Sequence, residues 1–152
     1  MKSYYVSGSK ILITEKGVNN SSVKLISENS LLMVIRSGIL KHTLPVAINS
    51  VPVTINQDMK AFTVDESRVK VRFLLYFFIL YQKHLLRKVR SVTADNIEFG
   101  EIKKVGIIIP PIVDQDKFET LVEKCMEVKQ ILKIQLIEME LLRKSLIKNY
   151  FN

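Results

Sequence analysis

The stretch IIIPPIVDQDKF, residues 107–118, divides the chain into two parts. Its three isoleucines predict a short buried strand. Pro110 and Pro111 then interrupt both strand and helix, so the boundary is sharp. Beyond the two prolines the sequence contains neither glycine nor proline. The stretch therefore predicts a small domain over residues 1–112 and one long helix within residues 113–152.

The start of the long helix carries its own signals. Asp114 is a residue type that favours the N-cap, and Val113 and Phe118 then occupy the two positions of a hydrophobic staple. We expect the helix to run to about Asn149, a length of about 50 Å.

Apolar side chains recur along this helix in a heptad pattern, interrupted by Gln135. Such a seam is typical of a coiled coil. A second apolar stripe follows another side, which favours a partner helix in addition to the home domain; a single wide face packed on the domain is the alternative. The seam, which is the predicted helix interface, comprises Phe118, Leu121, Cys125, Val128, Leu132, Met139, Leu142 and Leu146. The second stripe comprises Met126, Ile134, Ile137 and Leu141.

The residues before the prolines predict a β-rich domain with one buried helix. Segments 10–14, 30–38 and 51–56 are apolar and β-branched, which favours strands. Thr63 and Glu66 have the spacing of a capping box, so a helix is expected to begin near Thr63. The following apolar residues are too dense for a surface helix, which indicates burial.

After that helix, KKVGIIIP at 103–110 predicts a return to a strand. The fold class is therefore α+β: a small β-rich domain with one buried helix, followed by a long C-terminal coiled-coil helix.

The net charge of +8 is unevenly distributed. Residues 1–65 carry 7 basic and 4 acidic side chains, residues 66–112 carry 9 and 4, and residues 113–152 carry 7 and 7. The basic excess thus lies before the long helix. It suits a polyanion such as DNA, with ordinary solubilising charge as the alternative.

Composition and motifs argue against several classes of protein. The sequence has no apolar run of the roughly 18 residues that a membrane helix needs, and no signal-peptide pattern. The single cysteine, Cys125, fits a reducing cytoplasm. His42 and His84 stand alone, and the five glycines form no phosphate-binding loop. We therefore expect no enzyme activity, no catalytic residues, no metal and no cofactor.

Two segments place polar side chains beside apolar strands: IRSGILKHT at 35–43 and INQDMK at 55–60. Arg and Lys pair with guanine and Asn and Gln with adenine, and all of them also contact phosphates. The alternative is that they stabilise turns or helix ends. The candidate DNA-binding residues are Arg36, Lys41, His42, Asn56, Gln57 and Lys60, with Arg87, Lys88 and Arg90 as candidate phosphate contacts.

Two longer stretches, in this order, resemble the specificity subunit of type I restriction–modification enzymes. LLMVIRSGILKHTLPVAINSVPVTINQDMKA at 31–61 is similar to the later half of a target recognition domain in that family. VRSVTADNIEFGEIKKVGIIIPPIVDQDKF at 89–118 is similar to the end of such a domain, where Pro110, Pro111 and Gln115 lead into a long helix. The resemblance extends from about Gly8 onward.

The resemblance implies a non-catalytic protein that recognises double-stranded DNA. Specificity subunits in this family hold two target recognition domains, each reading half of a split site. Their long helices pair as an antiparallel spacer and bind modification subunits, which methylate adenine with S-adenosylmethionine. Restriction subunits join this assembly to cleave DNA.

One domain and one helix amount to at most half of such a subunit, so the resemblance further implies a homodimer through the helix. Fewer residues precede the helix than in the family's domains, which suggests a partial target recognition domain, a recombination cassette or a remnant. The alternative function is a helix-mediated adaptor that does not bind DNA.

Overall fold

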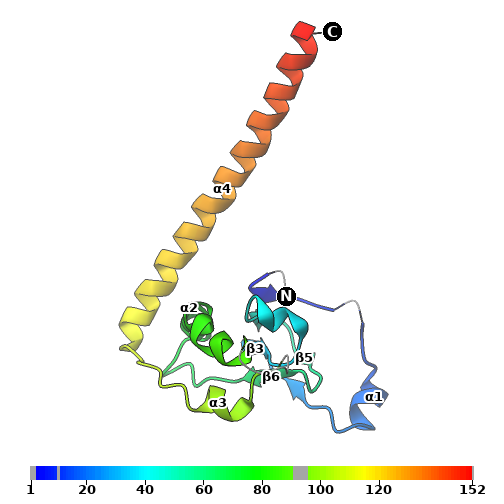
Figure 1. Ribbon diagram of the computed structural model, residues 1–152, viewed down its shortest axis with the longest axis vertical. Coiled ribbons are helices and arrows are strands. Elements are labelled where there is room, and N and C mark those ends of the chain that lie inside the picture. The colour runs from blue at the N-terminus through cyan, green and yellow to red at the C-terminus, as the bar shows by residue number, and fades with distance from the viewer. Residues whose placement is uncertain (1–2, 10, 91–95, 152) are drawn as a thin grey trace. The chain divides into compact units, whose positions relative to one another are not determined.

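The computed structural model describes residues 3–9, 11–90 and 96–151, except for the side chains of residues 88–90. The chain divides into two compact units, Met1–Gln115 and Asp116–Asn152, hereafter unit 1 and unit 2. Unit 1 combines short strands with helices, whereas the described part of unit 2 is entirely helical (Figure 1). The predicted α+β class with a long C-terminal helix is confirmed.

Unit 1 is built on a four-stranded sheet in the order β1-β4-β3-β6. The strands are β1 (Tyr5–Val6), β3 (Leu31–Val34), β4 (Val46–Asn49) and β6 (Met59–Phe62). β1 is parallel to β4, and β3 is antiparallel to both β4 and β6. A second, two-stranded sheet pairs β2 (Leu25–Ile26) with β5 (Val53–Thr54).

The helices of unit 1 differ in how they contribute to the core. Helix α2 (Val71–Arg90) contacts β3 and β4. It buries side chains spaced three and four residues apart, as one face of a helix requires. These are Val71, Leu74, Leu75, Phe78, Leu85 and Leu86. α1 (Glu15–Asn19) buries none of its residues, whereas η1 (Gly38–Lys41) and α3 (Phe99–Lys103) bury one each.

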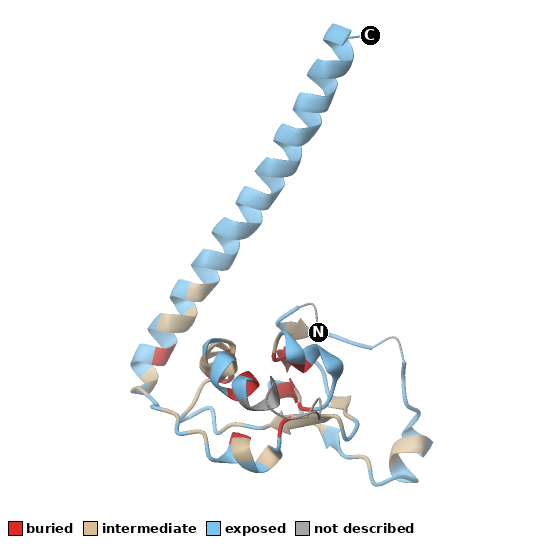
Figure 2. Cartoon of the chain, in the orientation of Figure 1, coloured by how far each residue is buried: buried red, intermediate tan, exposed pale blue. Residues whose placement is uncertain are grey.

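The core lies between the sheet and α2. Three consecutive β3 residues, Leu31, Leu32 and Met33, are buried, so the strand is covered on both faces. Figure 2 shows the buried residues gathered in unit 1, while α4 (Ile112–Phe151) is exposed beyond its first turns. Among the described residues, no helix is both long enough and apolar enough to span a membrane.

The buried helix begins later than predicted. α2 starts at Val71, and Thr63 does not cap it; the Thr63 hydroxyl instead lies 3.3 Å from the Ser30 hydroxyl. Asp65 organises the intervening segment as a turn, since its carboxylate accepts from the Ser67 backbone N–H and hydroxyl at 3.1 and 2.6 Å. This local side-chain bonding competes with a helix at these positions.

Two predicted strands are wrong. Residues 11–14 are irregular and lead into α1, and Ile11 and Leu12 are 86% and 85% exposed. Residues 105–110 are irregular too, because they have no paired neighbour among the described strands. Val105 and Ile107 still pack against the core, so alternate side chains of this segment point inward without a sheet.

The long helix begins three residues earlier than predicted, with Pro111 in place of Asp114 as the residue before its first turn. The backbone N–H groups of Asp114 and Gln115 both donate to the Pro111 carbonyl oxygen, at 2.9 and 3.2 Å. Asp114 therefore lies inside the first turn and is not the N-cap, and its carboxylate suits the positive end of the helix dipole. The helix continues to Phe151, two residues beyond the predicted end.

Candidate functional site

Four of the candidate DNA-binding residues come together at one end of the four-stranded sheet. β3 and β6 are antiparallel, with Val34 opposite Met59, so the end of one strand lies beside the start of the other. The backbone N–H groups of Ile35 and Arg36 extend this contact, since both donate to the Asp58 carbonyl oxygen at 2.8 and 3.2 Å. The candidates at this end are Arg36, Asn56, Gln57 and Lys60.

Asp58 links two of these candidates through its carboxylate. Its Oδ1 lies 3.6 Å from Arg36 Nη1, and its Oδ2 accepts from Asn56 Nδ2 at 3.4 Å. Asn56 Oδ1 in turn accepts from the Asp58 backbone N–H at 3.2 Å. Both ends of the Asn56 amide are thus used within the turn, whereas the Arg36 side chain is 61% exposed. Asp58 was not among the candidates that the sequence analysis named.

The other two candidates at this end differ in environment. Gln57 is exposed at the tip of the turn between β5 and β6. Lys60 is half-buried on β6, with its Nζ 5.6 Å from the centre of the Phe99 ring. Lys103 Nζ lies 4.8 Å from the same ring centre. Cation–π contact therefore holds two cations near this end of the sheet.

Lys41 and His42 lie on a different element, at the end of η1. Lys41 ends η1 and His42 is its C-cap, and both side chains are exposed. The next residues are tied to α2, because the Thr43 hydroxyl and the Leu44 backbone N–H both donate to Gln82 Oε1 at 3.1 Å. The Gln82 contact thus positions the turn that carries the two candidates.

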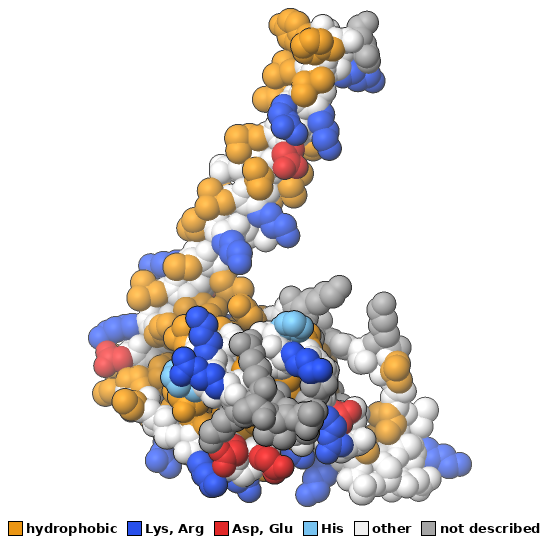
Figure 3. Space-filling view, in the orientation of Figure 1, with side chains coloured by type: hydrophobic (Ala, Val, Ile, Leu, Met, Phe, Trp, Pro, Cys, Tyr) orange, Lys and Arg blue, Asp and Glu red, His pale blue; other side chains and the backbone are white. Residues whose placement is uncertain are grey.

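The phosphate-contact candidates lie near the end of α2. Arg87 is exposed, while the side chains of Lys88 and Arg90 lie outside the described residues. The described Lys and Arg side chains are spread over the visible face of unit 1 (Figure 3).

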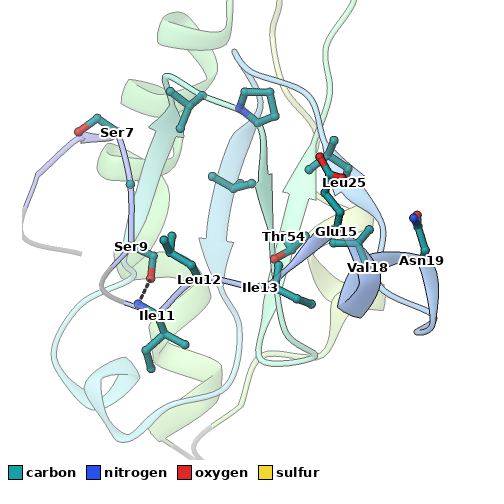
Figure 4. Close-up of a pocket in the computed structure, with 14 residues that line it drawn as sticks. Ser7, Ser9, Ile11, Leu12, Ile13, Glu15, Val18, Asn19, Leu25 and Thr54 are labelled. Carbon is teal, nitrogen blue, oxygen red and sulfur yellow. Dashed lines mark hydrogen bonds between the residues drawn. The ribbon is translucent and has the colours of Figure 1, made fainter.

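A hollow in unit 1 lies elsewhere, between the segment at 7–13, α1 and the β2–β5 sheet (Figure 4). It measures about 640 Å³ and is lined mainly by apolar side chains, among them Ile11, Leu12 and Leu25. Glu15 is the one ionisable group among its described lining residues. Nowhere in the described part of the chain do three or more His, Cys, Asp or Glu side chains form a metal-binding group.

α4 presents a second type of surface. Phe118 is half-buried, and the other predicted interface residues are exposed; Leu121, Leu132 and Met139 are 62%, 58% and 61% exposed. The second stripe is exposed as well, as are Ile131, Leu136 and Ile147, which belong to neither pattern. Apolar side chains therefore occupy more faces than the sequence analysis identified. Figure 3 shows them alternating with Lys and Arg on the visible side.

Gln115 anchors the first turn of α4 within unit 1. It is fully buried, and its Oε1 accepts from the Lys70 backbone N–H at 2.8 Å. Its Nε2 donates to the carbonyl oxygens of Arg68 at 3.0 Å and Pro110 at 2.8 Å. One side chain therefore satisfies three backbone groups in two segments. The sequence analysis named Gln115 only as part of the family resemblance, because burial of a glutamine has no local signal.

Comparison with known proteins identifies the family. A family model described as "Type I restriction modification DNA specificity domain" matches residues 2–138. The EcoR124I/EcoR124II type I restriction enzyme specificity subunit of Escherichia coli is 34% identical over 131 residues. That alignment covers 80% of this chain, and the chain spans only 32% of the relative. Specificity subunits of type I systems are non-catalytic, as predicted here. The chain belongs to the type I restriction–modification DNA specificity domain family.

Proposed function

We propose that the chain is a DNA sequence-recognition module of a type I restriction–modification enzyme, a half or truncated specificity subunit. Residues 1–112 act as a partial target recognition domain, and residues 113–152 act as the spacer and dimerisation helix. The observation that carries this proposal is the family match over residues 2–138, which spans nearly all of the first part and the helix as far as Glu138. The basic excess before the helix supports contact with DNA.

The proposed DNA face combines the end of the β3–β6 pair with η1. Arg36 and Gln57 are exposed there and read base edges, while Lys41, His42 and Lys60 add contacts to bases or phosphates. Asn56 shapes the turn that presents Gln57. Arg87, Lys88 and Arg90 contact phosphates.

The proposed role of α4 is assembly in the cytoplasm. Two copies pair through the seam, and the remaining apolar faces bind modification subunits, which restriction subunits then join. The extent of exposed apolar surface supports this role, because a helix that is apolar on several sides is normally buried. The modification subunit supplies the methylation chemistry, so this chain needs no cofactor.

A charge-reversal experiment tests the DNA-binding half of the proposal. The double variant Arg36→Glu/Lys41→Glu is compared with Lys16→Glu/Lys24→Glu, which makes the same charge change at exposed lysines of unit 1. Anisotropy titrations at low salt with a random-sequence duplex measure affinity. We expect at least a tenfold loss for the first pair and a smaller loss, from net charge alone, for the second. Equal losses would remove Arg36 and Lys41 from the DNA face.

A co-expression experiment tests the assembly half. The full chain is purified with a type I modification subunit from the same genome, and light scattering gives the mass of the complex. We expect capture of that subunit. A chain that forms helix-paired dimers, captures no modification subunit and binds no DNA would favour the adaptor alternative, which the exposed surface of α4 also supports.

A further inference from the structure

We propose that Asp58 is a positioning residue for DNA recognition, which directs Arg36 to a base edge and away from the phosphates. This inference rests on the proposed DNA-binding function. It gives a role to an acidic side chain in a surface that otherwise depends on cations.

The geometry fixes Asp58 relative to Arg36 through two sets of contacts. The Asp58 carbonyl oxygen accepts from the backbone N–H groups of Ile35 and Arg36, and its Oδ1 lies 3.6 Å from Arg36 Nη1. Its second carboxylate oxygen accepts from Asn56 Nδ2 at 3.4 Å. The carboxylate is thus held between the end of β3 and the start of β6, and is 35% exposed.

An arginine can contact either a phosphate or a base edge, and the negative charge of Asp58 affects these two contacts differently. A phosphate that approaches Arg36 also meets the Asp58 carboxylate, whose repulsion offsets the attraction to the guanidinium. A guanine edge carries no net charge and offers O6 and N7 as acceptors. The guanidinium has five N–H donors, and the Asp58 contact involves only Nη1. Donors therefore remain for a base, and the pair disfavours a phosphate.

The test uses Asp58→Asn in the full chain, which keeps the shape of the side chain and removes its charge. Asp65→Asn is the matched control, since Asp65 is an exposed aspartate bonded to Ser67 in a turn before α2. Anisotropy titrations over a range of salt use a random-sequence duplex. For Asp58→Asn we expect tighter binding and a salt dependence steeper by about one phosphate contact, which Asp65→Asn does not show.

Selection from a randomised duplex library measures sequence preference for the same variants. We expect Asp58→Asn to lose a preference of about five- to hundredfold at one base pair, while Asp65→Asn selects the wild-type sequences. Arg36→Lys keeps the cation without the planar fork, so it should lose the same preference while binding random duplex normally. It provides an independent test if Asp58→Asn proves unstable in thermal unfolding.

The outcomes separate this inference from the proposed function. If wild-type protein binds DNA, but Asp58→Asn matches Asp65→Asn in salt dependence and Arg36→Lys selects wild-type sequences, the inference is overturned and the proposed function stands. If wild-type protein binds no duplex at low salt, the proposed function fails and the inference fails with it.

Discussion

Unit 1 and α4 differ in how far their apolar side chains are exposed to solvent. In unit 1, Leu31, Met33, Leu40 and Leu75 are at most 1% exposed, and the sheet and α2 cover one another. Most apolar residues of α4 beyond its first turns are about half exposed or more. An isolated helix gains little stability in water, and long helices depend on packing of their apolar faces. The comparison teaches that unit 1 buries its own apolar side chains, whereas those of α4 stay exposed in the single chain, which is the surface that the proposed assembly would cover.

The largest expected effect is a loss of unfolding free energy when a core side chain of unit 1 is truncated. Phe78 is 3% exposed in α2, whereas Leu80 in the same helix is 78% exposed. Phe78→Ala should cost about 3–5 kcal/mol of unfolding free energy, because it leaves a cavity. Leu80→Ala should change it by less than about 0.5 kcal/mol. Urea unfolding followed by tyrosine fluorescence measures both, and similar losses would contradict the assigned core face.

A slightly smaller effect is expected at Gln115. Gln115→Leu leaves a backbone N–H and two carbonyl groups without their buried partner, which should cost about 2–4 kcal/mol of unfolding free energy. The matched control is Gln57→Leu, the same replacement at an exposed glutamine. The same urea titrations apply. A loss no larger than that of the control would show that the contacts of Gln115 contribute little.

The apolar surface of α4 gives the third prediction. Leu132 lies in the middle of the seam and is 58% exposed in the single chain. Leu132→Asp should weaken self-association at least about tenfold, or about 1.4 kcal/mol, because a charge would enter the paired interface. Unfolding of unit 1 should not change.

Gln130→Asp is the control for that variant, since it introduces the same charge two residues away, outside both apolar patterns. Sedimentation over a range of concentrations measures the dimer dissociation constant. Equal weakening by both variants, or by neither, would mean that the seam is not the dimer interface.

The sequence predicted secondary structure and burial correctly where the signal was local and no other contact opposed it. Pro110 and Pro111 located the start of α4 to within three residues, and the dense apolar run correctly predicted that α2 contributes to the core. The resemblance over 31–61 and 89–118 identified the family. Prediction from local sequence patterns failed where contacts with distant residues decide the structure. The apolar segment at 105–110 lacks a paired strand, and the Asp65 turn prevails over the Thr63 capping box.

The candidate site was predicted by residue type, and its geometry was not. Polar density in INQDMK made its residues DNA-binding candidates, with turn formation as the alternative, but the strand register that places Asp58 beside Arg36 is a long-range property. The same holds for Gln115, whose partners at Arg68 and Lys70 lie 47 and 45 residues away in the chain.

The smallest expected effect concerns pH and the turn before α2. The Ser67 hydroxyl, followed by its backbone N–H and nearby Arg68, lowers the pKa of Asp65 below its usual value. A lowered folded-state pKa stabilises the protein above the unfolded-state pKa of about 3.9, and this contribution disappears as the pH falls through the folded-state value. Asp65→Asn should therefore lower the urea midpoint slightly at neutral pH. The gap between wild type and variant should close only below about pH 4. Because the Asp65 carboxylate is exposed, solvent screens the effect, and a large gap at neutral pH, or one that persists in strong acid, would contradict this origin.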